Sequence, residues 1–259
     1  MGINQSKNNN IYLITYNCQI KYFSNYKANR LLNYILNYKT ADFILCIQGL
    51  YDKKTINYLK ENIVEKINIV ESKYDNGLFV FSSYDITSIE CYLFNTTNKQ
   101  YVNIIDLTKG YISFNIGLNN NLIAIYNTEL QNDISNNLLF NDIRLKQISE
   151  ILLFITEQKI CEKKQKLHII MGSLYLNDIK SNRLCDIINL LNKNIITNID
   201  QNTKDDYILF FTEINYKTND IIKYMHNNYG IELINAITRT EMNFAKNLPC
   251  EIILKIIKR

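Results

Sequence analysis

The sequence predicts an α/β fold in which two mixed β-sheets pack as a sandwich flanked by helices. Strand-like apolar runs alternate with stretches whose apolar residues recur at helical spacing. Hydrophobic residues make up 47% of the 259 positions, which is enough for the core of one large domain. One proline and seven glycines leave no room for a flexible linker. We therefore expect a flexible tether over residues 1–10 and a single domain over residues 11–259.

The first part of the chain alternates strands with helices. The apolar runs 11–17 and 42–48 predict two strands. Leu31, Leu32, Ile35 and Leu36 form a stripe that predicts a helix over residues 26–38. A similar stripe predicts a second helix over residues 55–67.

The rest of the chain adds hairpins, one long helix and a closing group of strands. Turns rich in Asn and Gly join four strand-like runs, 77–82, 86–94, 111–118 and 122–127. Apolar spacing predicts the longest helix over residues 140–158 and a short one over residues 186–191. Further strands are predicted at 167–171, 207–211, 231–237 and 251–257. This mixture of parallel-type and hairpin-type strands suits a two-sheet sandwich.

Charge and cysteine usage narrow the functional classes. The net charge of +4 is mild and the basic residues are scattered among acids, so we do not expect a nucleic-acid partner. The six cysteines fit no metal-binding spacing, and Cys18, Cys46 and Cys91 lie in apolar runs where buried free thiols are expected. No secretory signal and no membrane-spanning apolar stretch is visible, so we expect an intracellular protein.

The chain begins with a signal for N-terminal lipidation. Residues 1–7 read Met-Gly-Ile-Asn-Gln-Ser-Lys, in which Gly2 and Ser6 match the myristoylation motif. One myristoyl chain gives only marginal, reversible membrane binding. We therefore expect a partly soluble protein at the cytoplasmic face of a membrane. A second contact must come from the folded domain or from a protein partner.

The order of several short motifs in this chain resembles the order found in a known protein superfamily. Asn17 ends the first predicted strand and Gln48 ends the second. Residues 76–82 read Asn-Gly-Leu-Phe-Val-Phe-Ser, 128–131 read Thr-Glu-Leu-Gln, and 172–175 read Gly-Ser-Leu-Tyr. This order, over nearly the whole chain, resembles the endonuclease/exonuclease/phosphatase superfamily, nearest its neutral sphingomyelinase branch. The resemblance implies the four-layer DNase I-like fold. It also implies a site at the strand ends, where such enzymes hold a hydrated Mg²⁺.

At that implied site most catalytic residues of the superfamily are replaced. Asn17 is kept. Gly49 stands where members of the superfamily have a metal-binding Glu, so this position offers no side chain to bind a metal. Glu129 stands where they have a phosphate-contacting His, and a carboxylate there repels phosphate. Ser173 and Tyr175 replace the Asp that orients water and its Asn partner.

The implied acid–base pair near the C-terminus is also changed. Asp206 matches the Asp that supports the catalytic His. Cys250 and Glu251 stand where relatives have an Asp followed by that His. If the resemblance holds, the carboxylates of Asp206 and Glu251 should face each other, and one of their pKa values should rise.

Two functional interpretations follow. The first is an inactive, myristoylated member of this fold that needs no cofactor and acts as a membrane-associated binding or scaffold protein with an unidentified protein partner. The second is an enzyme whose rebuilt site holds Mg²⁺ on Asn17, Glu129, Asp206 and Glu251 and cleaves a sphingomyelin-like lipid or a nucleic acid. We favour the first, because no base with a pKa near neutrality is visible. His168 and His226 fall in a strand and a loop, where a lone His is usually an ordinary polar residue.

Overall fold

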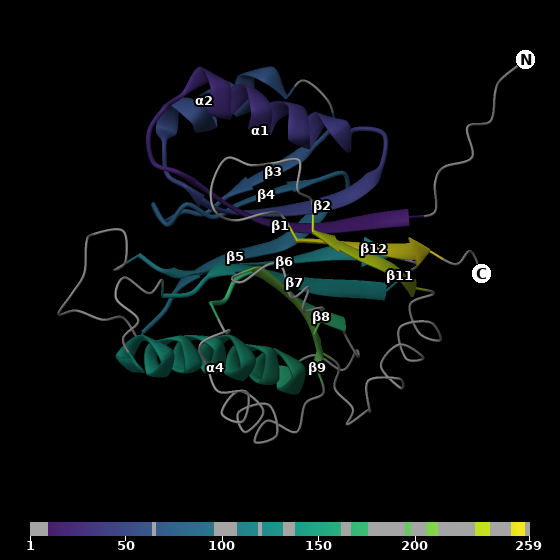
Figure 1. The fold of residues 1–259 in the computed structure, drawn as a ribbon. Coiled ribbons are helices and arrows are strands. Elements are labelled where there is room, and N and C mark those ends of the chain that lie inside the picture. The colour runs from purple at the N-terminus through teal and green to yellow at the C-terminus, as the bar shows by residue number, and fades with distance from the viewer. Residues whose placement is uncertain are drawn as a thin grey trace, which may run out of the picture.

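The computed structural model describes the greater part of the chain. The described residues are 10–63, 66–95, 108–118, 121–131, 138–161 and 167–175, and the strands over 195–197, 206–211, 231–238 and 250–256. They form four layers, in which two sheets stack face to face and helices cover both outer faces (Figure 1). The predicted fold class is therefore confirmed.

The first sheet has six strands in the order β11-β12-β1-β2-β4-β3. Its members are β1 (Asn10–Ile20), β2 (Asp42–Leu50), β3 (Asn68–Glu71), β4 (Phe79–Ser82), β11 (Ile231–Thr238) and β12 (Cys250–Ile256). Helices α1 (Asn25–Asn37) and α2 (Lys53–Asn62) lie over its outer face. Each helix begins with a polar cap, because the side chains of Ser24 and Asp52 accept hydrogen bonds from backbone N–H groups of the first turn.

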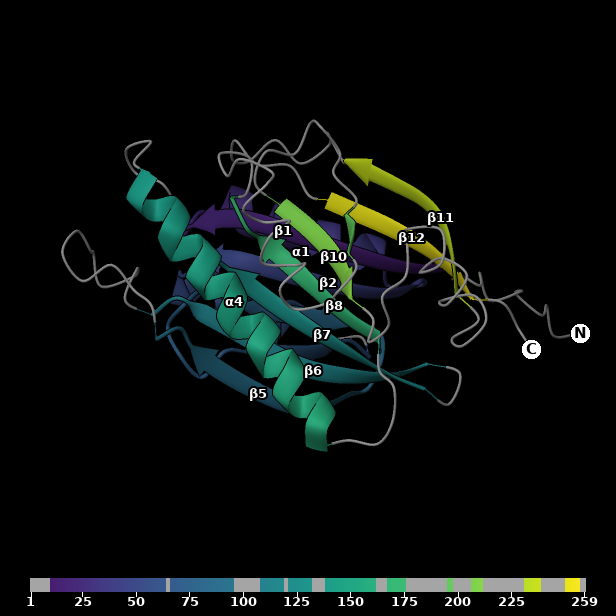
Figure 2. The ribbon, with the colours of Figure 1, turned by 90° about the horizontal axis from the view of Figure 1, so that it is seen from below.

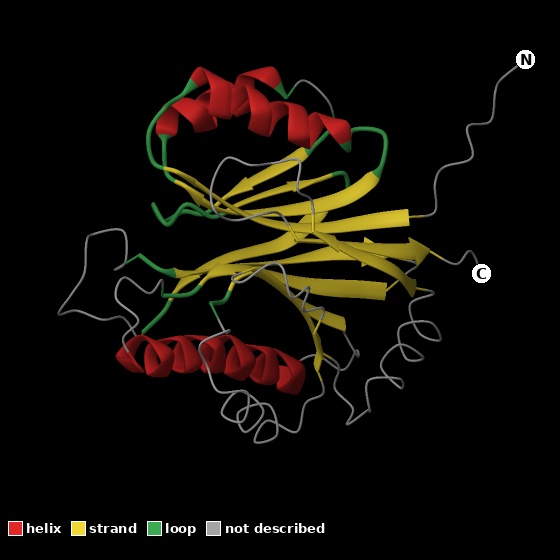
Figure 3. Cartoon of the chain, viewed as in Figure 1, coloured by secondary structure: helices red, strands yellow, loops and turns green. Residues whose placement is uncertain are grey.

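The second sheet also has six strands, in the order β5-β6-β7-β8-β10-β9. Its members are β5 (Ile86–Leu93), β6 (Gly110–Leu118), β7 (Asn121–Glu129), β8 (Leu167–Ser173), β9 (Ile195–Thr197) and β10 (Asp206–Phe211). The long helix α4 (Leu138–Cys161) crosses its outer face, as Figures 2 and 3 show. Both sheets mix parallel and antiparallel pairs.

Three apolar clusters hold the layers together. Side chains such as Ile44, Phe114 and Ile169 fill the space between the two sheets. A second cluster joins the first sheet to α1 and α2, and a third joins the second sheet to α4. Because alternate strand residues point to opposite faces, the central strands contribute to the clusters on both sides.

Two parallel strand pairs position the functional site. β1 runs parallel to β2 with Asn17 opposite Gln48, and β7 runs parallel to β8 with Glu129 opposite Ser173. The carboxyl ends of each pair therefore lie at one edge of its sheet. The two edges meet across the sandwich, since the Asn17 and Glu129 side chains are hydrogen bonded to each other.

Several predicted boundaries differ from the structure. The second helix ends at Asn62 rather than at residue 67, because the chain leaves helical geometry at Ile63 and residues 68–71 pair with β4 as a strand. The short strands β3 and β9 were not predicted. The predicted helix over 186–191 lies outside the described residues.

Two further findings concern thiols and membrane helices. Cys18 and Cys46 are buried free thiols as predicted, whereas Cys91 is only half-buried because it lies on the edge strand β5. In the part of the chain that the structure describes, no helix combines the length and apolar character needed to cross a membrane.

Candidate functional site

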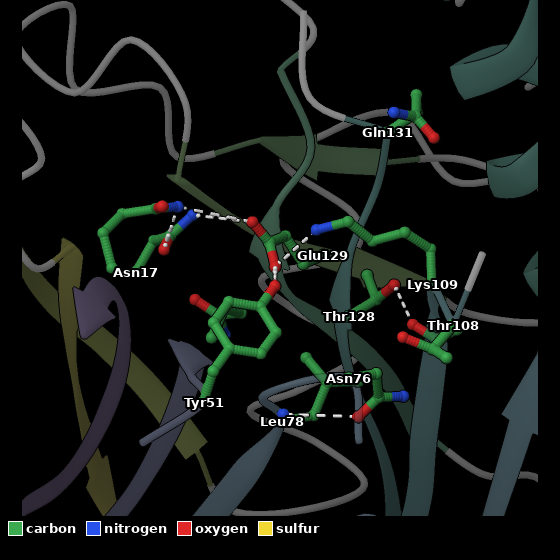
Figure 4. Close-up of polar contacts among 12 residues, drawn as sticks. Asn17, Tyr51, Asn76, Leu78, Thr108, Lys109, Thr128, Glu129 and Gln131 are labelled. Carbon is green, nitrogen blue, oxygen red and sulfur yellow. Dashed lines mark hydrogen bonds and ion pairs between the residues drawn. The ribbon is translucent and has the colours of Figure 1, made fainter. Parts of the chain in front are cut away.

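The strand ends enclose a buried carboxylate. Glu129 is the last residue of β7, and its side chain is 2% exposed. Its Oε2 atom lies 2.6 Å from Lys109 Nζ and accepts a hydrogen bond from the Tyr51 hydroxyl at 3.0 Å (Figure 4). Its Oε1 atom accepts hydrogen bonds from Asn17 Nδ2 and Tyr175 OH, both at 3.2 Å, and from Gln19 Nε2 at 3.4 Å. Five donors therefore converge on one carboxylate, and we call these six residues the charged network.

Lys109 supplies the positive charge of this network. It immediately precedes β6, whose Tyr111 pairs with Thr128, so the strand register places Lys109 beside the end of β7. Its side chain is 3% exposed. A buried ammonium and a buried carboxylate each lose much hydration, so each depends on the other for compensation. The sequence analysis did not predict this pairing.

Asn17 holds the first sheet to this carboxylate. Its Nδ2 donates to Glu129 and also to the Tyr175 hydroxyl at 2.9 Å. Its Oδ1 accepts from Gln19 Nε2 at 2.7 Å, which is possible because β1 bulges between Asn17 and Ile20 and Gln19 adopts a φ of 50°. Both ends of the Asn17 amide are therefore hydrogen bonded within the network.

Gly49 is required by the geometry around Asn17. It has a φ of +70°, which side chains with a Cβ rarely adopt. A Cβ at this position would lie 2.6 Å from Asn17 Oδ1 and 2.9 Å from the backbone nitrogen of Gln19. The space that a metal-binding Glu would enter is thus occupied by the Asn17–Gln19 contact.

The turn after β8 supplies the remaining member of the network. Gly172 lies so close to β7 that a Cβ there would be 1.8 Å from the Thr128 carbonyl oxygen. This close approach brings the buried Ser173 opposite Glu129 and lets Tyr175, with a φ of 50°, reach both Asn17 and Glu129. The Gly-Ser-Leu-Tyr motif therefore packs a tyrosine hydroxyl against the carboxylate.

A second buried network lies beside the first and carries no charge. Gln48 Nε2 donates to Asn127 Oδ1 at 2.7 Å and to Thr15 Oγ1 at 3.0 Å. Asn127 Nδ2 donates in turn to the backbone carbonyls of Ile47 and Phe79 at 3.2 and 2.8 Å. We call Thr15, Gln48 and Asn127 the amide network. It links the two sheets through neutral groups whose hydrogen bonds are satisfied.

For the other predicted site residues, the structure describes at most the backbone. Ser173 on β8 lies between Glu129 on β7 and Asp206 on β10, because it pairs with both. Glu251 on β12 pairs with Ile14 on β1, three residues before Asn17. The side chains of Asp206, Cys250 and Glu251 are outside the described residues, so their predicted meeting stays a prediction. His226 is likewise outside the described residues.

His168 lies far from the charged network. It is 2% exposed on β8, five residues before Ser173, and its Nδ1 contacts the Tyr126 hydroxyl at 3.0 Å. Five residues of strand span about 17 Å, so this imidazole does not reach the carboxylate. Its role as an ordinary buried polar residue agrees with the sequence interpretation.

The thiol of Cys18, which follows Asn17 in β1, is also unsuited to nucleophilic chemistry. Burial, together with a smaller effect of the nearby Glu129 charge, raises the pKa of Cys18 to about 12. The thiol is therefore neutral near pH 7, and a neutral thiol is a weak nucleophile.

A pocket adjoins the charged network on the side of Tyr51. Its volume is about 750 Å³. Tyr51 and Thr108 form the wall nearest the network, because Thr108 directly precedes Lys109. The charged residues around it are Lys53, Lys60, Lys73, Glu71 and Asp75. A molecule in this pocket would contact the network through Tyr51.

The described residues do not fit the Mg²⁺ site that the resemblance implies. Mg²⁺ needs oxygen ligands with free lone pairs in near-octahedral geometry. The Glu129 oxygens already accept from five donors, one of them an ammonium, and Asn17 Oδ1 accepts from Gln19. Among the residues that the structure describes, no three His, Cys, Asp or Glu side chains gather to hold a metal ion.

Sequence reasoning missed three of the six network members. Gln19, Tyr51 and Lys109 are separated from Glu129 by 110, 78 and 20 positions. Lys109 offered a weak signal, since its neighbour Gly110 opens a strand. Gln19 and Tyr51 belong to no motif that points to the site.

No protein-family model and no curated protein matches this sequence. Solved structures, however, share its fold. Sphingomyelinase C from Streptomyces griseocarneus matches with a TM-score of 0.66 and 13% identity, over 96% of this chain and 99% of that one. Beta toxin from Staphylococcus aureus, in a structure with bound magnesium ions, matches with a TM-score of 0.64 and 16% identity, over 93% and 98%.

A DNA-processing protein has the same architecture. D. rerio TDP2, complexed with a single-strand DNA product, matches with a TM-score of 0.64 and 13% identity, over 95% of this chain and 99% of that one. Identities this low establish the fold and nothing finer. The predicted DNase I-like fold is confirmed, and sphingomyelinases are among the proteins that share it.

Proposed function

We propose that this protein is a catalytically inactive form of the phosphodiesterase fold, myristoylated at Gly2, that acts as a membrane-associated binding or scaffold protein. The fold matches enzymes of the phosphodiesterase type. We infer that this protein lacks their activity, because the charged network stands in place of the groups that such chemistry needs.

The main support is the saturation of Glu129. This carboxylate stands where the superfamily has a phosphate-contacting His, and it is buried beneath Lys109 and four further donors. In this arrangement the Lys109 ammonium provides the charge compensation that a divalent cation would otherwise bring. A site that is neutralised internally has little affinity left for a cation or for the phosphate that the cation would bind.

Gly49 and Ser173 support the same conclusion. A metal ligand at position 49 would collide with Asn17. Ser173 offers a hydroxyl, which stays protonated near pH 7 because its pKa lies far above that of a carboxylate. A protonated hydroxyl is a very weak base, so it cannot take a proton from water as an ionised carboxylate can. Loss of a single such group usually lowers an enzymatic rate by orders of magnitude.

Hydrolysis assays test the loss of activity. The purified, acylated protein should not cleave sphingomyelin, phosphoinositides or DNA in the presence of Mg²⁺, under conditions in which an active sphingomyelinase or nuclease does. Turnover that requires Mg²⁺, follows the protein through purification and falls in an Asn17→Ala variant would overturn the proposal in favour of a rebuilt metal-dependent enzyme.

Fractionation tests the lipid anchor. Gly2→Ala removes the acyl acceptor, so the variant should move from the membrane fraction to the soluble pool. The unsubstituted protein should itself be divided between the two, because one acyl chain binds marginally. Asn9→Ala is a matched control that changes the tether outside the motif. Equal distribution of Gly2→Ala and Asn9→Ala would show that the motif does not anchor the protein.

A further inference from the structure

The surface around the start of α1 combines exposed aromatic rings with basic side chains. Tyr22 is 82% exposed, Tyr26 65% and Phe23 39%. They fall within five residues, whereas the other exposed large apolar side chains of the described chain are spread over β5, β7 and α4. A cluster of this kind is unusual on a surface that meets only water.

Basic residues surround these rings. Lys21 is exposed, while Lys27 and Arg30 are partly covered. Arg30 Nη1 donates to the Tyr26 hydroxyl at 2.9 Å, and its guanidinium lies 5.4 Å from the centre of that ring. We call Lys21, Tyr22, Phe23, Tyr26, Lys27 and Arg30 the aromatic–basic patch.

The charge distribution of the chain singles out this region. Residues 1–41 contain five basic residues and no Asp or Glu. The other 218 residues contain 24 basic and 25 acidic residues. The whole positive excess of the protein therefore lies in the segment that carries the lipidation motif and the aromatic–basic patch.

The topology sets this patch and the lipidated tether at the two ends of one helix. Ile11 at the start of β1 lies beside Asp42 at the start of β2, so α1 runs back along the sheet from the end of β1 to its beginning. The patch lies at the amino end of α1, and the tether joins the chain near its carboxyl end. Between them α1 presents the exposed polar side chains of Asn29, Asn33 and Asn37.

The tether is long enough to reach the surface that α1 faces. The eight residues from Gly2 to Asn9 span at most about 29 Å when extended. A helix with its side chains is about 10–12 Å thick. An acyl chain at Gly2 can therefore enter a flat surface laid against the outer side of α1, while the patch touches the same surface about 20 Å away.

We propose that the aromatic–basic patch is the second membrane contact, and that it docks the outer face of α1 on an anionic lipid surface beside the inserted acyl chain. Lys21, Lys27 and Arg30 meet lipid phosphates and carboxylates. Tyr22 enters the interface, where an aromatic ring with a polar edge is favoured, and Phe23 buries its apolar ring beside it. This inference rests on the membrane association in the proposed function. It adds the orientation and the lipid class.

Vesicle sedimentation with the full-length acylated protein tests the proposal. One set of vesicles is phosphatidylcholine alone, and the other contains about one-third phosphatidylserine. Binding should be stronger on the anionic set. Lys21→Gln/Lys27→Gln should weaken it there by about 25-fold, because each basic residue near such a surface contributes about fivefold. Tyr22→Ser/Phe23→Ser should weaken binding to both sets by about tenfold.

Two matched controls change the same chemistry elsewhere. Lys73→Gln/Lys146→Gln removes two exposed charges, and Leu122→Ser/Leu153→Ser removes two exposed apolar side chains from the opposite side of the sandwich. Both should bind within about twofold of the unsubstituted protein. Thermal unfolding of every variant confirms that the fold is retained.

The Gly2→Ala variant separates this inference from the proposed function. If the patch variants bind as well as the controls while Gly2→Ala does not bind, the patch proposal is wrong and the acyl anchor stands; a protein partner is then the occupant to seek. If the patch variants lose binding while Gly2→Ala keeps it, the patch stands and the acyl anchor fails. If the unsubstituted acylated protein binds neither vesicle, both proposals are wrong.

Discussion

The charged network and the amide network occupy the same end of the sandwich but differ in the charge of the groups that they bury. The amide network spans the two sheets with neutral groups, and the donors of Thr15, Gln48 and Asn127 all find acceptors within the network or in backbone carbonyls. The charged network gathers five donors onto Glu129 and includes a buried cation, Lys109. The first links the two sheets through neutral groups, whereas the second surrounds a buried charge at the strand ends.

The difference shows that buried neutral groups and buried charges need different kinds of partner. A neutral buried group needs only a hydrogen-bond partner, so the amide network is independent of any ligand. A buried carboxylate also needs a compensating charge. Here Lys109 supplies that charge from the same chain, so the strand ends stay closed around Glu129. We expect substitutions to expose this difference.

The largest effect should come from removing the buried cation. Lys109→Met leaves the Glu129 carboxylate buried without a compensating charge, so the free energy of unfolding should fall by about 3–5 kcal/mol. Urea denaturation measures this loss. Lys146→Met, on the exposed side of α4, is the matched control and should change the free energy of unfolding by less than about 0.5 kcal/mol.

A double variant sharpens this result. Adding Glu129→Gln to Lys109→Met replaces the carboxylate with a neutral amide that can still accept hydrogen bonds, so part of the lost stability should return. A double variant no more stable than Lys109→Met would mean that the lysine acts through packing of its aliphatic chain rather than through its charge.

An intermediate effect should follow from placing a carboxylate at position 49, where the resemblance implies a metal ligand. Gly49→Glu forces a side chain into a positive φ and against Asn17 Oδ1, so it should lower the free energy of unfolding by about 3 kcal/mol. Mg²⁺ should not raise the melting temperature of this variant. Gly117→Glu is the control, because a Cβ there meets nothing within 4 Å. A stable Gly49→Glu variant whose melting temperature rises with Mg²⁺ would reveal a metal site that one substitution restores.

The smallest effect should come from the amide network. Gln48→Leu leaves the Asn127 Oδ1 atom without its donor, so the free energy of unfolding should fall by about 1–2 kcal/mol. Gln48→Glu should cost more than Gln48→Leu, because it buries a charge that no cation faces in this network. Chemical denaturation of the two variants compares them. A Gln48→Leu variant less stable than Lys109→Met would reverse the ranking of the two networks.

The residues of the sequence predicted much of this fold for clear physical reasons. Long apolar runs such as 11–17 and 167–171 became buried central strands, since only strands covered on both faces are apolar throughout. Stripes at helical spacing gave α1 and α4 within one to three residues. The short strands β3 and β9 were missed because their pairing partners, not their own few residues, make them strands.

The site was predictable only where a motif marked it. Asn17, Glu129 and Tyr175 were named from their motifs, and the structure brings them into contact. The sequence analysis predicted that the charge of Glu129 would repel phosphate, and it named no residue that would pair with that charge. The structure instead buries that charge and neutralises it with Lys109.

By itself the sequence determined which residues are apolar and at what spacing, and so the order of the strands and helices. It also determined which catalytic residue types are present, and that the first 41 residues carry all of the net positive charge. The tertiary structure alone decided the partners of each buried polar group. Gln19, Tyr51 and Lys109 reach Glu129 because the bulge in β1, the end of β2 and the register of β6 against β7 bring them there. Such contacts join residues far apart in the chain, and no local pattern of residues encodes them.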